Sequence, residues 1–167
     1  IDNLYKKGVV VGTGNDEFQP QREVTREEFI KMLLLTLKYE IEDGDSNFDD
    51  VSDNAWYSSY IYSATKNGLI KGISDKKFGI GLPITREDVA VLIWRSCQGE
   101  NVSESKFSDD GEVSSYAKNA VNWLKEKGIV VGYEDGSFRP KNLISRAEAA
   151  KILWNLSEMT SLNYKNM

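Results

Sequence analysis

The sequence contains no histidine and only one cysteine, Cys97, among its 167 residues. Without histidine, the chain cannot build a Ser-His-Asp or Cys-His catalytic centre, or a histidine metal site, from its own residues. Cys97 continues a helical stripe with Val89 and Ile93, so we interpret it as a small buried apolar residue rather than a reactive thiol. No pair of carboxylates stands out as a glycosidase acid and nucleophile. We therefore expect no enzyme activity and no cofactor.

Long apolar runs and an excess of positive charge are also missing. No segment is apolar over the length needed to cross a bilayer, and none has the order of a signal segment, so we expect neither in this chain. The net charge of -5 argues against nucleic acid and anionic membranes as partners, because such binding needs a concentrated basic surface. The hydrophobic fraction of 40% indicates a folded protein. Any bound anion would have to be met by local arginines.

One unit of about 60 residues occurs three times in the chain. The residues that align without a gap at this spacing include Gly8, Gly68 and Gly128, Phe18, Phe78 and Phe138, and Arg26, Arg86 and Arg146. We place the three copies at 1–41, 48–99 and 107–158. Because Ile1 aligns with Ile61, the first copy lacks about half of its first helix, and we expect the protein to continue upstream.

Each copy has the sequence signals of a helix, a loop and a second helix. In the third copy, apolar residues from Val113 to Leu124 recur at steps of mostly three and four, which predicts an amphipathic first helix. Gly128 is placed to end this helix as a left-handed cap. The loop that follows is rich in turn residues and carries Phe138, which we expect to be buried.

The second helix of the third copy begins with a capping box formed by Ser145 and Glu148. Its apolar stripe consists of Ala149, Ile152, Leu153 and Leu156. Three such stripes can bury one another, so the sequence predicts an all-α fold with three pseudo-symmetric helix-loop-helix repeats around a central three-helix bundle. Arg146 occupies the first turn, where the helix dipole disfavours a cation by about 0.3–1 kcal/mol.

Together these features resemble a tandem of S-layer homology modules. The resemblance rests on the repeat length, the F-x-D openings of copies two and three, the loop KGIVVGYEDGSFRP and the motif ISRAEAA. It implies a three-pronged spindle and an extracellular location at the bacterial cell wall or S-layer. It also implies a non-catalytic anchor that binds a secondary cell-wall polysaccharide attached to peptidoglycan, often through a pyruvate ketal, in grooves between repeats. The alternative partners are other surface-layer proteins, in a self-assembly role.

The resemblance makes the second-helix arginine of each copy the anion contact. The first candidate ligand-binding residues are Arg26, Arg86 and Arg146. On the residues alone, a salt bridge to a nearby acid such as Glu27, Glu87 or a loop aspartate is favoured instead. Secondary candidates are turn residues and aromatic residues that can contact a sugar: Asp75, Asp135, Gly136, Trp56 and Tyr133.

Two segments depart from the repeat pattern. The acidic stretch from Glu42 to Asp50 lacks the glycine and the glutamate of an EF-hand loop, so we interpret it as a solvated linker rather than a calcium site. Copy two has Ile80 where the others have proline and Asp88 where the others have glutamate. We therefore expect the three grooves to be unequal.

Overall fold

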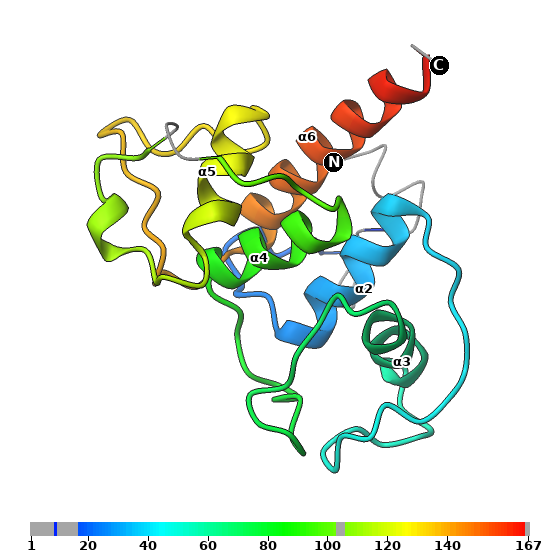
Figure 1. The fold of residues 1–167 in the computed structure, drawn as a ribbon. Helices are drawn as coiled ribbons and strands as arrows, with labels where there is room; N and C mark the ends of the chain where they lie inside the picture. The colour runs from blue at the N-terminus through cyan, green and yellow to red at the C-terminus, as the bar shows by residue number, and fades with distance from the viewer. Residues whose placement is uncertain (1–8, 10–16, 103–105, 166–167) are drawn as a thin grey trace.

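The computed structural model describes residue 9 and residues 17–102 and 106–165, with side chains described to residue 161. The helices in these ranges are α2 (Arg26–Leu37), α3 (Ser58–Lys66), α4 (Arg86–Ser96), the 3-10 helix η1 (Asp110–Glu112), α5 (Lys118–Glu126) and α6 (Arg146–Lys165) (Figure 1). Extended backbone in the described residues is limited to isolated bridges. The predicted all-α class is confirmed. Predictions for the truncated first helix and its Gly8 cap lie outside the described residues.

The N-terminal ends of α2, α4 and α6 are joined by a closed ring of three backbone hydrogen bonds. The amide of Val24 donates to the carbonyl of Ile144 (3.0 Å), Ile144 donates to Ile84 (3.1 Å), and Ile84 donates to Val24 (3.0 Å). All three residues are at most 1% exposed. The amides of the first-turn arginines bond in the opposite direction around the ring, at 2.9 Å each: Arg26 to Leu82, Arg86 to Asn142, and Arg146 to Arg22. The third copy is thus bonded back to the first.

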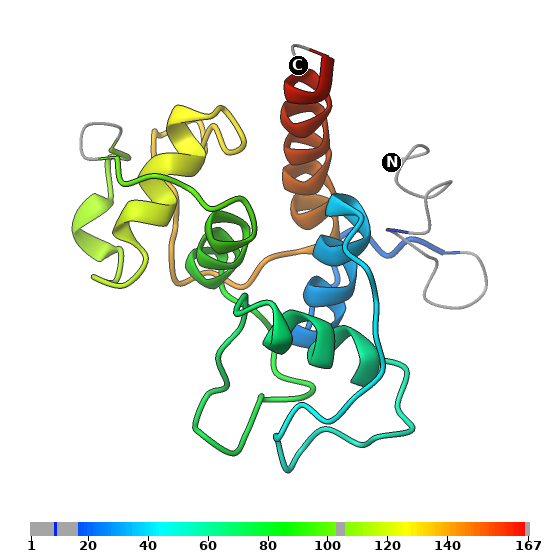
Figure 2. The same cartoon turned by 45° about the vertical axis from the view of Figure 1, so that its right-hand side comes forward.

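In copies two and three, the first helix packs on the second helix of the copy before it. α3 packs on α2 and α5 packs on α4, while α2 also packs against α6. Figure 2 shows α6 extending well beyond the other helices. The predicted α6 stripe is buried, namely Ala149, Ile152, Leu153 and Leu156. The predicted central bundle is present in part: α2 packs against α6, whereas α4 is joined to these two helices chiefly through the hydrogen-bonded ring. The three-pronged spindle stays a prediction.

The first helix of the third copy is shorter than the sequence predicts. The apolar spacing begins at Val113, but α5 begins only at Lys118. The buried carboxylate of Glu87 accepts hydrogen bonds from the amide and the hydroxyl of Ser114, both at 3.0 Å, and from the hydroxyl of Tyr116 at 3.1 Å. These bonds hold the segment against the start of α4 in a turn conformation. The prediction of a helix from Val113 was therefore wrong by about one turn.

Three local predictions are confirmed. Gly128 ends α5 in the left-handed conformation, with φ 67°. Ser145 and Glu148 form the capping box, since the Ser145 amide donates to the Glu148 carboxylate at 2.9 Å and the Glu148 amide donates back to the serine hydroxyl at 3.3 Å. Phe138 is 1% exposed and stacks on Phe107 with ring centroids 5.3 Å apart.

Cys97 and the acidic linker have defined surroundings. Cys97 caps the C-terminal end of α4 and is half-buried rather than fully buried, and burial raises the pKa of its thiol to about 11. A protonated thiol is a poor nucleophile at neutral pH. The linker runs along α3, where Glu42 pairs with Lys66 at 2.6 Å and its amide donates to Ser63. Among the described residues, no acidic or cysteine cluster could hold a metal ion and no helix could cross a membrane.

The aspartates of the F-x-D openings fix the loops. The carboxylate of Asp50 accepts hydrogen bonds from the three amides of residues 78–80, at 2.8, 2.8 and 3.2 Å. Asp109 accepts from the two amides of residues 138–139, at 2.8 and 2.7 Å. Burial opposes ionisation of Asp50, but the backbone amides outweigh it and hold its pKa below the usual range. The opening motif thus anchors the loop that carries the buried phenylalanine.

Asp50→Ala is expected to lower the free energy of unfolding by about 1.5–3 kcal/mol, because backbone amides lose a charged acceptor. Urea denaturation measures this change. Asp53→Ala is the matched control, since Asp53 is an exposed carboxylate on the same segment, and its effect should stay within about 0.5 kcal/mol. Equal effects of the two substitutions would contradict the anchoring role of Asp50.

Candidate functional site

Each first-turn arginine reaches into the loop of the next copy. In all three copies its Nε donates to the carbonyl of the loop phenylalanine, and its guanidinium lies over that ring at 5.0–5.2 Å from the centroid. The pairs are Arg26 with Phe78 (3.1 Å), Arg86 with Phe138 (2.8 Å) and Arg146 with Phe18 (2.9 Å). The position that is unfavourable within the helix is therefore favourable between copies.

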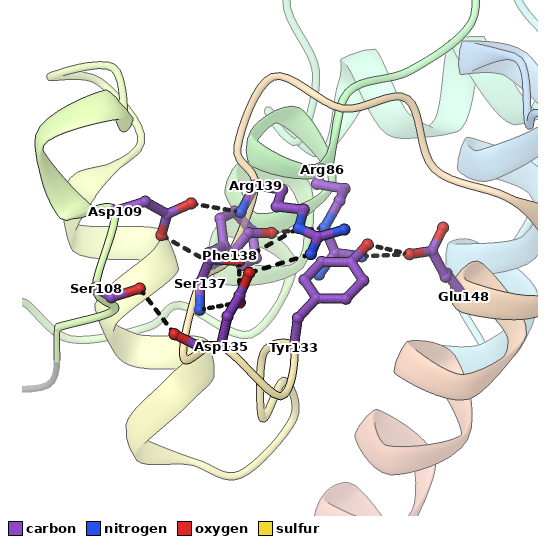
Figure 3. Close-up of polar contacts among 9 residues, drawn as sticks. All are labelled: Arg86, Ser108, Asp109, Tyr133, Asp135, Ser137, Phe138, Arg139 and Glu148. Atoms are coloured by element: carbon purple, nitrogen blue, oxygen red, sulfur yellow. Dashed lines mark hydrogen bonds and ion pairs between the residues drawn. The ribbon is translucent and has the colours of Figure 1, made fainter.

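The contact between copies two and three, which we call the Arg86 junction, consists of Arg86, Tyr133, Phe138 and Glu148 (Figure 3). Nη1 of Arg86 donates to Oε1 of Glu148 at 3.1 Å, and the Tyr133 hydroxyl donates to the same oxygen. Arg86 is 5% exposed, and its guanidinium lies 4.9 Å from the centroid of the Tyr133 ring. Burial opposes ionisation of Glu148, but the bonds from Tyr133 and Ser145 and the charge of Arg86 hold its pKa below the usual range.

Asp135 and Gly136 shape the loop that carries Tyr133. The Asp135 carboxylate accepts hydrogen bonds from the Ser137 hydroxyl at 2.5 Å, from the Ser137 amide at 2.9 Å and from Arg139 at 3.1 Å, which hold its pKa at about 2. The Arg139 guanidinium in turn lies 3.9 Å from the centroid of the Tyr133 ring. Gly136 adopts φ 77° and its amide closes the turn onto the Tyr133 carbonyl. Both residues hold Tyr133 in place, as turn formers do.

A cavity of about 320 Å³ lies at the Arg86 junction. Residues 129–133 of the loop form one wall. The other lining residues are Arg86 and a face of α6 made of Ala147, Glu148, Lys151, Ile152 and Asn155. The cavity therefore presents a guanidinium, a tyrosine ring, a carboxylate and an ammonium group beside apolar surface, which suits a polar ligand with a charged substituent.

The contact between copies one and two, the Arg26 junction, has different chemistry. Nη2 of Arg26 donates to the Lys71 carbonyl at 3.2 Å, and the side chain is partly exposed. Ile73 stands where the third copy has its tyrosine. Asp88, in place of the glutamate, accepts from Thr85 and Tyr116 at 2.8 and 2.9 Å. Within the described residues Arg26 forms no salt bridge, so the two junctions differ as the sequence predicts.

The remaining candidates lie outside the Arg86 cavity. Arg146 is 5% exposed and faces the first copy. Trp56 is 52% exposed; the Lys31 ammonium lies 5.3 Å from its ring centroid and the Tyr57 ring packs edge-on against it. Asp75 is exposed in a tight turn of the second loop. The structure thus brings Arg86 and Tyr133 together and leaves Asp75 and Trp56 apart from them.

Sequence reasoning missed Glu148 as the partner of Arg86 and misplaced Glu87. Glu87 was named as an acid that an arginine could pair with, but its carboxylate instead binds Lys141 at 2.6 Å, as well as Ser114 and Tyr116. It is 3% exposed. Burial opposes its ionisation, but these donors outweigh it and lower its pKa. The sequence contained one signal against Glu87 as the partner. The second helical position is Glu27 in copy one and Glu87 in copy two, but Ala147 in copy three, so an acid at this position is not common to the three copies.

In the part of the chain that the structure describes, three second helices are joined in a ring, and copies two and three each carry a first helix and a loop, which defines a tandem-repeat module with contact surfaces between its copies. The S-layer homology domain family matches residues 1–30, 47–90 and 106–150, and the chain belongs to this family. The predicted triplet, and with it the location at the bacterial cell surface, is confirmed by this match.

The chain is also similar to parts of larger proteins. It is 34% identical to the exoglucanase XynX of Acetivibrio thermocellus over 96% of this chain and 15% of that protein. It is 28% identical to the surface-layer 125 kDa protein of Lysinibacillus sphaericus, over 91% of this chain and 13% of that protein. For the cellulosome-anchoring protein of Acetivibrio thermocellus the identity is 27%, over 87% of this chain and 34% of that protein. The chain thus spans a minor part of each relative.

Glu87→Gln is expected to reduce stability near neutral pH and to flatten its dependence on acid. Because the folded-state pKa of Glu87 is lowered, the ionised group stabilises the fold above its unfolded-state pKa of about 4.3. That contribution is lost as the pH falls through the folded-state pKa. Urea denaturation over a series of pH values measures the slope.

The control is Glu112→Gln, which removes an exposed carboxylate from η1. Its acid dependence should match that of the unchanged protein. If the Glu87 variant also matches, the buried carboxylate has no role in acid stability.

Proposed function

We propose that the chain is a non-catalytic anchoring module that holds its protein on the bacterial cell wall by binding an anionic secondary cell-wall polysaccharide. The observation that carries this proposal is the cavity at the Arg86 junction, where cationic, hydroxyl and apolar groups from two copies converge. Family membership and the surface-layer and cellulosome-anchoring relatives support the anchoring role. An acidic substituent such as a pyruvate ketal fits the cationic groups.

Repetition of the junction supports binding to a polymer. Arg26, Arg86 and Arg146 occupy equivalent positions between successive copies, so one glycan chain can contact more than one junction. Simultaneous contacts raise the effective affinity well above that of one site, because the second binding event is intramolecular. The polymer therefore need not bind tightly at any single junction.

The glucanase name of one relative does not require an activity in this segment. XynX extends far beyond the part that matches, since the chain covers 15% of it. The chain contains no histidine, and we assign its role to holding a passenger rather than to catalysis.

Sedimentation with bacterial cell-wall sacculi tests the proposal. The chain is expected to sediment with native sacculi and to remain in solution after the secondary polysaccharide is removed chemically. Isolated polysaccharide should compete. Unchanged sedimentation with stripped sacculi, or self-association without any polymer, would instead favour assembly with other surface-layer proteins.

Arg26→Gln is expected to weaken binding to native sacculi about tenfold, which corresponds to the loss of one charge-assisted hydrogen bond of about 1.5 kcal/mol. Arg26 is preferred for this test because it is partly exposed, whereas Arg86 and Arg146 are buried. Thermal unfolding followed by circular dichroism shows whether the fold is kept. Full binding by a folded variant would remove Arg26 from the binding surface.

A further inference from the structure

The positive charge of Arg86 is already neutralised within its own junction. Its Nε is bonded to the Phe138 carbonyl and its Nη1 to Glu148, and its side chain is almost entirely buried. Glu148 also accepts the Tyr133 hydroxyl. An acidic ligand that approached this guanidinium would meet the Glu148 carboxylate on the same side of the cavity. Arg86 therefore offers little net attraction to an anion.

Lys151 is a second cation on the wall of the same cavity. It lies one turn after Ala147 and one turn before Asn155, and this spacing of four places the three residues on one face of α6, which lines the cavity. Lys151 is exposed, and among the described residues it takes part in no salt bridge. Within these residues its ammonium is thus not ion-paired, whereas the guanidinium of Arg86 is paired with Glu148, which lies one turn before Lys151 on the same helix.

The equivalent positions of the other copies do not provide this cation. Val91 is the counterpart in copy two and is 5% exposed. Lys31 is the counterpart in copy one, and its ammonium lies over the rings of Trp56 and Tyr60, at 5.3 and 5.7 Å from the centroids. The free ammonium at this position is therefore specific to the Arg86 junction. At the Arg26 junction the arginine itself remains without a salt bridge among the described residues, so each of these two junctions has one cation that is not ion-paired.

We propose that Lys151, rather than Arg86, pairs with the acidic group of the ligand in the Arg86 cavity. Glu148 and Tyr133 hold Arg86 as a positioning residue, which keeps the loop wall of the cavity in place through the Phe138 carbonyl. This inference rests on the proposed binding of an anionic wall polysaccharide, and it assigns the charge recognition to a residue outside the repeat motif.

Titration calorimetry with solubilised secondary cell-wall polysaccharide tests the inference. Lys151→Gln is expected to weaken binding about five- to tenfold, as for loss of one charge-assisted contact, and to reduce its dependence on salt. The substitution is on an exposed helix position, so the melting temperature should not change. Lys66→Gln is the matched control, because it removes one exposed lysine from α3 that does not line the cavity, and it should bind as the unchanged protein does.

Glu148→Gln gives an independent test. The substitution removes the counter-ion of Arg86 while an amide oxygen can still accept the Ser145 capping bond, so binding is expected to increase about threefold. Glu42→Gln is the control for the change in net charge, since Glu42 pairs with Lys66 away from the junction.

The outcomes separate the two proposals. If the unchanged protein and the Lys66 variant bind the polymer and the Lys151 variant binds equally well, the role of Lys151 is overturned and the anchoring function stands. Weaker binding by a folded Glu148 variant would also overturn it, because the carboxylate would then be a ligand contact. If the unchanged protein does not bind the polymer, the proposed function fails and the inference fails with it.

Discussion

The closed ring of hydrogen bonds among Val24, Ile84 and Ile144 is the constraint on which the rest of the structure depends. Each of these residues is buried, so an unmade bond would leave a backbone group unpaired away from water, at a cost of about 1–3 kcal/mol. Each copy donates one bond to a neighbour and accepts one from another, so no copy can complete the ring alone. The ring sets the direction in which each second helix begins. It therefore determines which loop each first-turn arginine meets.

The repeat arginine combines a local cost with a gain between copies. A cation in the first turn opposes the helix dipole, yet the same position brings the guanidinium to a carbonyl and an aromatic ring of the next copy. At the Arg86 junction the charge is further matched by a glutamate that also caps the following helix. One glutamate thus links helix initiation, arginine placement and cavity electrostatics. The arginine of the repeat motif therefore mainly connects neighbouring copies, and the groups available to a ligand belong to the residues around it.

Features encoded by neighbouring residues were predictable from the sequence. The Gly128 cap, the Ser145 capping box and the burial of Phe138 depend on residues within one copy, and all three were confirmed. The start of the first helix in copy three was predicted too early, at Val113. Its true start depends on a different kind of information, because the segment before α5 is bound by a carboxylate of the preceding copy.

The partner of Arg86 was unpredictable for the same reason. Glu87 is adjacent in sequence, but side chains at successive helical positions do not face each other, and Glu148 comes from the next copy. The choice between them requires the direction in which the copies follow one another around the ring. The sequence of a single copy does not contain that direction. The candidate arginines could therefore be identified from the sequence, but the acid that pairs with Arg86 could not.

The return of the third copy to the first has a consequence for how such modules change in evolution. The bond between Arg146 and the Phe18 carbonyl joins residues 128 positions apart and closes the chain on itself. In linear repeat proteins each unit contacts only its neighbours, so units can be gained or lost at an end. Here a duplication or deletion of one unit would separate the donors and acceptors of the remaining copies. A ring of this kind therefore needs all three units, and changes that preserve it fall in the loops and on exposed helix faces.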